Sequence, residues 1–365
     1  MPSTARGRGA RASSRPASAI EPVHVRGLYD PPVRYYIQFP AGTGGLVEES
    51  LGSYATGVDV VYADDSAMVF DADSAPGDIE RIPFAKNSFS VIADVPRERL
   101  ETAALDIADF IAEDRLDSSA RTFRLMFHVD GELVGIGARA RRRLESAVSY
   151  ASGQRVAPSG AGEEYWIVGR TEYDRFMFCR RHNRPKLPAK ARGAISHELS
   201  AMLVAASRPE PGDVFLDPFA GSGSFVEARL AFPAQRIVYS DTALRLLRHE
   251  FTDRIRDSRA IEFLADDALE LPSIDDRSVD VIVTDPPWGE FEELELPVPE
   301  FLDRMAQSFD RVLRPDTGRL VVLTARRIAP VAEAALEKAG FALNAAHGIL
   351  VNGHPATVII GGRPT

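Results

Sequence analysis

The stretch VFLDPFAGSGSFVEARL, residues 214–230, begins as an apolar strand, passes through a glycine loop and ends as a helix. Asp217 closes the strand, Gly221 and Gly223 lie in the loop, and the helix is expected over 224–231. A strand, a tight loop and a helix in this order predict the first unit of an α/β sheet. Glycine lets the backbone turn sharply and approach a ligand without a Cβ clash.

Strands and helices continue to alternate from this unit to the end of the chain. The near-continuous apolar strands predict a parallel sheet with helices on both faces. The short turn between the last two strands predicts that they pair antiparallel. Strands are expected at 213–217, 236–241, 261–267, 279–285, 319–325, 347–352 and 356–360. Helices are expected at 194–207, 224–231, 242–256, 299–313 and 329–339.

The residues before this alternation mix strand-like and helix-like segments without a regular order, which indicates an α+β domain. Strands are expected at 34–39, in two parts of 58–73, and at 122–131, 164–169 and 175–181. Helices are expected at 46–54, 97–114 and 139–153, the last ended by Gly153.

The chain is expected to contain two domains, because its 365 residues exceed one ordinary hydrophobic core. We assign residues 1–22 to a disordered basic tail, 23–185 to the α+β domain and 186–365 to the α/β domain, which begins with a basic, proline-containing linker.

The composition predicts a cytoplasmic protein. The tail has arginines but lacks the apolar core of a secretory signal, and no apolar run is long enough to span a bilayer. Cys179 is the sole cysteine, so an intrachain disulfide and a cysteine metal cluster are both excluded.

Three carboxylates at the ends of successive strands predict a cofactor with a nucleoside and an amino-acid part. Asp217 could bind a cationic amino group, Asp241 the ribose hydroxyls and Asp267 the adenine amine, with Ala268 leaving room for the ring. The loop residues expected to contact the cofactor are Phe219, Ala220, Gly221 and Gly223. A dinucleotide fits less well, because Val226 replaces the third glycine of its loop. For each aspartate alone, helix capping is the alternative.

A second motif, VDVIVTDPPWGEF at 279–291, places Asp285, two prolines and Trp288 at another strand end. The Asp285 carboxylate and the Pro286 carbonyl could accept both hydrogens of an exocyclic amine and so direct its lone pair outward. Proline restricts the loop, and Trp288 could stack on a flat base. The alternative is a strand-ending turn with a buried tryptophan.

DPFAGSG and DPPW in this order resemble the class I S-adenosylmethionine-dependent methyltransferases, from about Ala194 to the chain end. The resemblance implies a Rossmann-like sheet, S-adenosylmethionine as cofactor, and methylation of a nucleobase amine. The reaction then needs no metal and no covalent nucleophile, because a methyl sulfonium is already a strong electrophile.

The order of elements in the front domain resembles the THUMP-containing RNA methyltransferases. That resemblance implies RNA as partner, in most cases tRNA, and N2-methylguanosine as product. Methylation of rRNA guanine or of adenine-N6 in DNA stays an alternative, as does a non-catalytic RNA-binding module. The oligomeric state stays open.

A basic block supports an RNA-binding surface, although a solvated charged surface explains the charge equally well. Residues 121–192 contain 15 Lys/Arg and 7 Asp/Glu, whereas the whole chain has a net charge of −10. The residues expected to contact RNA phosphates are Arg139, Arg141, Arg142, Arg143, Arg181, Arg184, Lys186 and Arg192.

Overall fold

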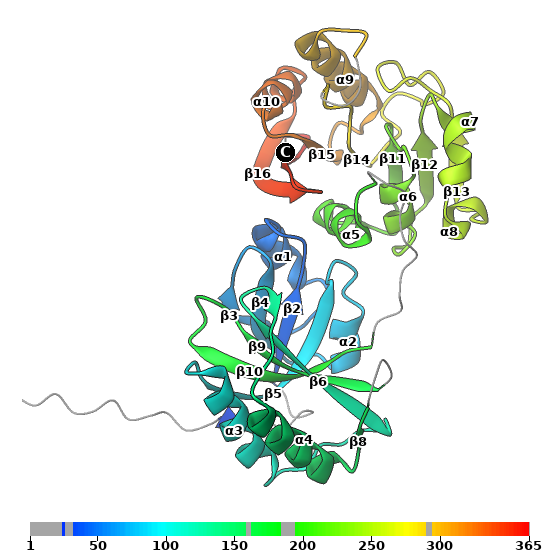
Figure 1. The fold of residues 1–365 in the computed structure, drawn as a ribbon. Helices are drawn as coiled ribbons and strands as arrows, with labels where there is room; N and C mark the ends of the chain where they lie inside the picture. Colours follow the sequence, from blue (N-terminus) through cyan, green and yellow to red (C-terminus); the bar gives the residue numbers. More distant parts are fainter. Residues whose placement is uncertain (1–23, 26–31, 158–161, 184–193, 290–293, 365) are drawn as a thin grey trace, which may run out of the picture.

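The computed structural model describes residues 24–25, 32–157, 162–183, 194–289 and 294–364. These residues form two β-sheets, each with its own helices, and the two halves meet along one side (Figure 1). In the described residues, no helix is both long and apolar enough to cross a membrane.

The first sheet lies in the N-terminal half, and its path runs in the order β3-β4-β2-β5-β10-β9-β6-β7. Most neighbours pair antiparallel, but β6 and β9 pair parallel. Its strands are β1 (His24–Val25), β2 (Val33–Gln38), β3 (Asp59–Ala63), β4 (Ala67–Ala72), β5 (Asn87–Pro96), β6 (Thr122–Val129), β7 (Glu132–Leu133), β8 (Arg155–Val156), β9 (Glu163–Gly169) and β10 (Arg175–Arg181).

The long central strand β5 is absent from the sequence prediction. Its polar residues hide the strand pattern, because Ser88, Ser90 and Asp94 are buried beside apolar neighbours. Asp94 is tolerated there because it pairs with Arg34 at 3.0 Å and with Arg175. From the sequence alone, a buried and paired aspartate such as Asp94 cannot be distinguished from an exposed loop residue.

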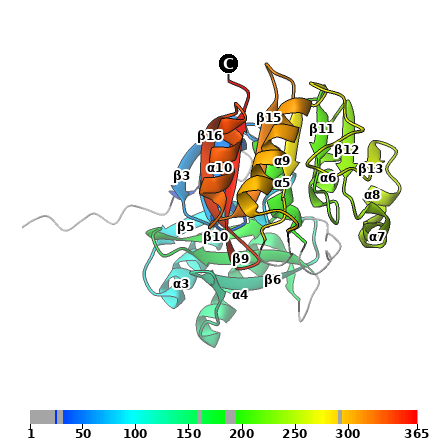
Figure 2. The same ribbon diagram turned by 90° about the horizontal axis from the view of Figure 1, so that it is seen from above.

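Helices cover the first sheet on opposite sides. These helices are α1 (Gly44–Leu51), α2 (Pro76–Glu80), α3 (Leu100–Ile111) and α4 (Ala138–Ser152). α1 and α2 lie toward the second half, whereas α3 and α4 pack together on the side turned away from it (Figures 1 and 2). Gly153 ends α4 in a left-handed conformation with φ of 71°, as predicted.

The second sheet has the strand order β13-β12-β11-β14-β15-β17-β16, and its pairing directions confirm the predicted parallel sheet with an antiparallel last strand. The first five strands in this order pair parallel, and the last two contacts are antiparallel. Its strands are β11 (Val214–Asp217), β12 (Arg236–Ser240), β13 (Ile261–Leu264), β14 (Val281–Thr284), β15 (Arg319–Ala325), β16 (Ala342–Val351) and β17 (His354–Gly362).

Helices cover both faces of the second sheet, as the apolar strands predicted. α5 (His197–Ala206) and α6 (Ser224–Arg229) pack on one face, and α9 (Val298–Val312) and α10 (Ala329–Lys338) on the other (Figure 1). Adjacent strand residues alternate between these two cores: Phe215 faces the first and Leu216 the second.

The helix predicted over 242–256 is wrong, because the segment breaks into α7 (Leu244–Leu247), a 3₁₀ turn (Arg248–Glu250) and α8 (Asp253–Arg256). The break occurs at Phe251, whose backbone is extended. The Phe251 ring packs against Tyr239 and Phe263, with centroids 5.2 and 5.6 Å away. Burying this ring, worth about 1.5–3 kcal/mol, outweighs the local helical propensity.

α5 joins the two halves. The sequence indicated one apolar face, but every residue from Leu199 to Ala205 is buried. The helix contacts α1 of the N-terminal half as well as α6 and β15. Apolar residues of both halves therefore form one continuous core cluster around it.

Candidate functional site

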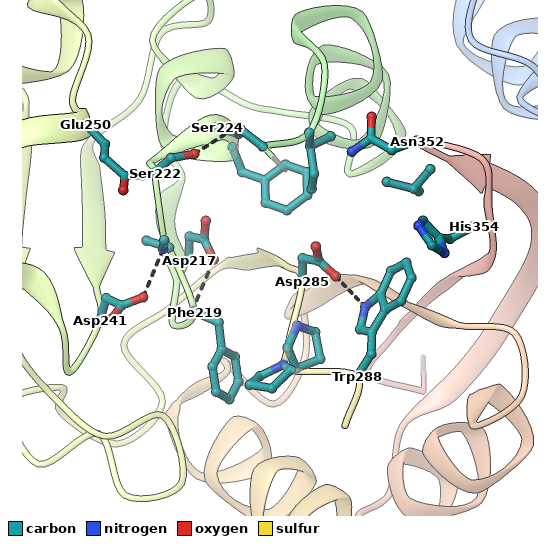
Figure 3. A pocket seen from close by; sticks show the side chains of 18 residues that line it. Asp217, Phe219, Ser222, Ser224, Asp241, Glu250, Asp285, Trp288, Asn352 and His354 are labelled. Carbon is teal, nitrogen blue, oxygen red and sulfur yellow. Dashed lines mark hydrogen bonds between the residues drawn. The ribbon is translucent and has the colours of Figure 1, made fainter. Parts of the chain in front are cut away.

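A cavity of about 760 Å³ lies at the carboxyl edge of the second sheet. Its wall includes Asp217 at the end of β11, Asp241 just after β12 and Asp285 just after β14 (Figure 3). β12 and β14 lie on opposite sides of β11, so the chain reverses its strand order here. Parallel sheets bind ligands at such reversal points, because the loops diverge and leave a crevice.

Asp217 occupies the buried floor of the cavity. Its Oδ1 accepts hydrogen bonds from the Thr284 hydroxyl at 2.9 Å and from the Phe219 amide at 3.3 Å. Its Oδ2 is buried and has no hydrogen-bond partner among the described residues. Burial raises the pKa of Asp217 well above its ordinary value, and the Asp241 and Asp285 carboxylates raise it further. A cationic partner for Oδ2 would relieve this cost.

Asp241 holds the glycine loop in place. Its Oδ2 accepts from the Gly221 amide at 2.9 Å and its Oδ1 from the Ala243 amide at 2.8 Å. Each oxygen keeps a second lone pair, so a diol could bind beside these contacts. Asp241 therefore caps local backbone amides and can still accept hydrogen bonds from a ligand.

Glycine is required at Gly223, where φ is 84° and a Cβ would lie 2.6 Å from the Ile255 side chain. Gly221 also has a positive φ, of 51°, and it lines the cavity together with Ala220 and Phe219. The loop thus presents backbone to the cavity where a larger residue would intrude.

The structure does not bring Asp267 and Ala268 into the cavity wall. β13 ends at Leu264, three residues before Asp267, whose exposed carboxylate accepts from the Leu269 amide at 2.9 Å. Local capping explains this carboxylate, and Ala268 is buried beside it. Their predicted contact with an adenine ring gains no support from this geometry.

The DPPW loop forms the opposite wall. Asp285 and Trp288 are half-buried, Pro286 is buried, and the Trp288 indole N–H donates to Asp285 Oδ1 at 2.7 Å. This bond from an N–H to a carboxylate fixes the ring and the acid relative to each other. Arg327 anchors the loop from outside by donating to the Trp288 carbonyl at 2.8 Å.

Five further polar side chains in the wall were not predicted from the sequence: Ser222, Ser224, Glu250, Asn352 and His354. Glu250 enters the wall because the segment breaks at the adjacent Phe251. Asn352 and His354 belong to the β16–β17 turn, which reaches the carboxyl edge because β17 runs antiparallel to β15. That direction was predicted, so the turn's position followed from the sequence.

The predicted RNA-contacting arginines differ in how they are engaged. Arg141 pairs with Glu145 at 3.0 Å and Arg143 with Asp109 at 2.7 Å. Within the described chain, Arg139 and Arg142 form no ion pair, and both are exposed.

Arg181 is bound within the first sheet. It pairs with Glu164 at 3.1 Å and donates to Asn87 at 3.0 Å. The remaining predicted contacts, Arg184, Lys186 and Arg192, lie outside the described residues.

No cluster of three or more metal-ligating side chains occurs in the residues that the structure describes. The cavity's acidic groups are instead held by amides, a hydroxyl and an indole.

Part of the chain is similar to known methyltransferases. Residues 184–257 and 252–351 match the family model of the RMKL-like methyltransferase domain. Over 140 residues, the chain is 31% identical to a probable tRNA (guanine(10)-N2)-dimethyltransferase of Methanothermococcus thermolithotrophicus, covering 36% of this chain and 82% of the relative.

Solved structures extend the similarity of fold across both halves. TrmN from Thermus thermophilus is 21% identical, with a TM-score of 0.64 over 91% of this chain and 100% of that one. SMU.472 complexed with SAH is 13% identical, with a TM-score of 0.61 over 92% and 99%. The chain therefore belongs to the RMKL-like methyltransferase family and is an S-adenosylmethionine-dependent methyltransferase.

Proposed function

We propose that this enzyme methylates the exocyclic N2 amine of a guanine in tRNA. The observation that carries the proposal is one cavity that places Asp217 on its floor and Asp285 on its wall. We assign the first to the cofactor and the second to the target amine.

The cofactor end of the cavity suits S-adenosylmethionine. Asp217 Oδ2, buried and without a partner among the described residues, suits the cationic amino group of the methionine part. Asp241 suits the ribose hydroxyls, and the glycine loop allows close approach of the backbone. When bound, the cofactor supplies an electrophilic methyl group on a sulfonium.

The target end suits a flat base with an amine. Asp285 accepts one amine hydrogen and the Pro286 carbonyl the other, which directs the nitrogen lone pair toward the methyl group. The Trp288 ring provides a stacking surface, worth about 1–3 kcal/mol per base. If bound, the cofactor would supply the methyl group and keep the bonding electrons on its sulfur, and Asp285 would take the proton that the amine loses.

The relative from Methanothermococcus thermolithotrophicus, a probable tRNA (guanine(10)-N2)-dimethyltransferase, favours guanine in tRNA as the substrate. The N-terminal sheet, whose order of elements resembles a THUMP domain, is proposed to bind the RNA through exposed arginines such as Arg139 and Arg142. We propose that residues 23–185 form this RNA-binding domain and that residues 186–365 form the methyltransferase domain.

Nucleoside mass spectrometry tests the proposal. Unmodified tRNA incubated with the purified protein and S-adenosylmethionine should gain N2-methylguanosine, and the Asp285→Ala variant should produce none. N6-methyladenosine in its place would favour adenine N6 as the target amine. If N2-methylguanosine forms in rRNA under the same conditions and not in tRNA, the substrate is rRNA and the assigned chemistry stays the same.

A further inference from the structure

The turn between β16 and β17 lines the target end of the cavity. Asn352 and Gly353 form a two-residue turn between the paired residues Val351 and His354. Their φ angles of 50° and 88° give the doubly left-handed backbone of a tight hairpin, which asparagine and glycine tolerate best. Asn352 is therefore held in place by backbone geometry.

The side chain of Asn352 lies on the Trp288 side of the cavity, whereas Asp241 and Glu250 lie at the other end (Figure 3). Within the described part of the chain, no group forms a hydrogen bond with its amide. The amide offers one acceptor and two donor hydrogens on one planar group. The target end thus contains an unengaged side chain that can pair with two adjacent polar atoms.

We infer that Asn352 recognises the target guanine by accepting from its ring N1–H and donating to its O6. This inference rests on the proposed function, because it takes the N2 amine as held by Asp285. With N2 held there, N1–H and O6 stay available on the same edge of guanine, a donor next to an acceptor. An amide matches that pair bidentately, as asparagine and glutamine do on other base edges.

The same amide disfavours adenine at this end. With its N6 amine held by Asp285, adenine presents ring nitrogens that only accept, so the Asn352 carbonyl would face a lone pair. An acceptor that faces an acceptor gains no hydrogen bond, which makes Asn352 a specificity-determining residue. Trp288 and Asp285 act on any flat base with an amine and cannot supply this discrimination.

Asn352→Gly and Asn352→Asp test the inference without disturbing the turn, because glycine and aspartate also tolerate its backbone. The first removes the amide, and the second keeps the acceptor but replaces the donor. Asn344→Asp is the matched control: it changes an exposed asparagine on β16, outside this cavity. Affinity for S-adenosylhomocysteine should stay within about twofold in all three, as expected for changes away from the cofactor contacts.

The decisive measurement is kcat/KM on two versions of one tRNA transcript. One carries guanosine at the mapped target position, and the other carries 2-aminopurine, which keeps the 2-amine but lacks O6 and the N1 hydrogen. The unaltered enzyme should prefer guanosine about ten- to a hundredfold, the range of a bidentate base contact. In Asn352→Gly this preference should fall to about threefold or less, and in Asn352→Asp to an intermediate value. The Asn344→Asp control should keep the full preference.

Three results would overturn the inference: an unchanged preference in Asn352→Gly, no preference in the unaltered enzyme, or an equal loss in Asn344→Asp. In each of these the enzyme still methylates guanine N2, so the proposed function stands. If no guanine N2 is methylated at all, the proposed function fails and the inference fails with it.

Discussion

The cavity at the edge of the second sheet and the interior of the first sheet use their charged residues in opposite ways. In the second sheet, Asp217, Asp241 and Asp285 gather around one cavity, and Asp217 keeps an unpaired buried oxygen. In the first sheet, buried charges neutralise each other: Arg34 pairs with Asp71 at 2.9 Å and with Asp94 at 3.0 Å. Asp217 Oδ2 has no hydrogen-bond partner among the described residues and is available for a ligand, whereas a paired carboxylate is not.

This contrast limits what the number of basic residues in 121–192 indicates about RNA binding. The basic block of 121–192 suggested a broad phosphate-binding surface, but several of its arginines serve the domain itself. Arg170 pairs with Asp64 at 2.5 Å, and Arg181 with Glu164. Only geometry separates a structural arginine from one exposed for a partner.

The largest effect is expected at the carboxyl edge of the second sheet. Asp285→Ala should lower kcat about 10²- to 10⁴-fold, the usual range for a lost acid–base group. Asp275→Ala, which removes an exposed carboxylate in the loop before β14, is the matched control and should keep normal turnover. Methyl transfer from labelled cofactor to tRNA measures both. Substantial turnover by Asp285→Ala would show that the cavity's wall carries no catalytic acceptor.

A smaller effect, on tRNA binding, is expected in the N-terminal half. It tests whether its exposed arginines and its ion-paired arginines differ in their contribution. Reversing Arg139 and Arg142 to Glu should weaken tRNA binding about tenfold and lower the salt slope by about 1–2, because phosphate contacts release counterions.

Reversing the ion-paired Arg141 and Arg143 is the matched control, since it changes the net charge by the same amount. We expect this control to weaken binding less. Binding titrations at several salt concentrations measure both pairs. Equal weakening would mean that overall charge, and not the exposed pair, governs the binding.

The smallest effect concerns stability. The folded state raises the pKa of Asp217, so it retains a proton that the unfolded chain releases above the ordinary pKa. Stability is therefore lost as pH rises from that ordinary value to the raised one. Asp217→Asn removes the penalty and should raise the free energy of unfolding at neutral pH by roughly 0.5–2 kcal/mol.

Denaturant unfolding at several pH values checks this stability prediction. The gain from Asp217→Asn should shrink toward zero near pH 3, where the aspartate is protonated in both states. A loss of stability at neutral pH would contradict the raised pKa.

Much of the second sheet was predictable because its strands are apolar and its loops carry glycine, proline and aspartate at strand ends. β15 (Arg319–Ala325) appears with the predicted bounds, and the antiparallel last pair is confirmed. Local signals decide these elements. The broken helix at Phe251 was not predictable in this way, because ring packing against Tyr239 and Phe263 decides it.

Within the site, Asp217, Gly221, Asp241 and Asp285 line one cavity, as expected for residues at or near the ends of parallel strands. Asp267 lies outside the cavity wall, because its strand ends three residues earlier and its carboxylate caps a turn. The indole bond from Trp288 to Asp285 was also missed, because the rotamers of both side chains determine it.

The central claim is that Asp217 serves the cofactor and Asp285 the target amine. Isothermal titration of S-adenosylhomocysteine into the unaltered enzyme, Asp217→Asn and Asp285→Ala tests this claim most directly. We predict that Asp217→Asn weakens binding about 10- to 100-fold, as expected for a lost hydrogen bond to a charged group, and that Asp285→Ala binds normally. Normal binding by Asp217→Asn, or an equal loss in both variants, would contradict it.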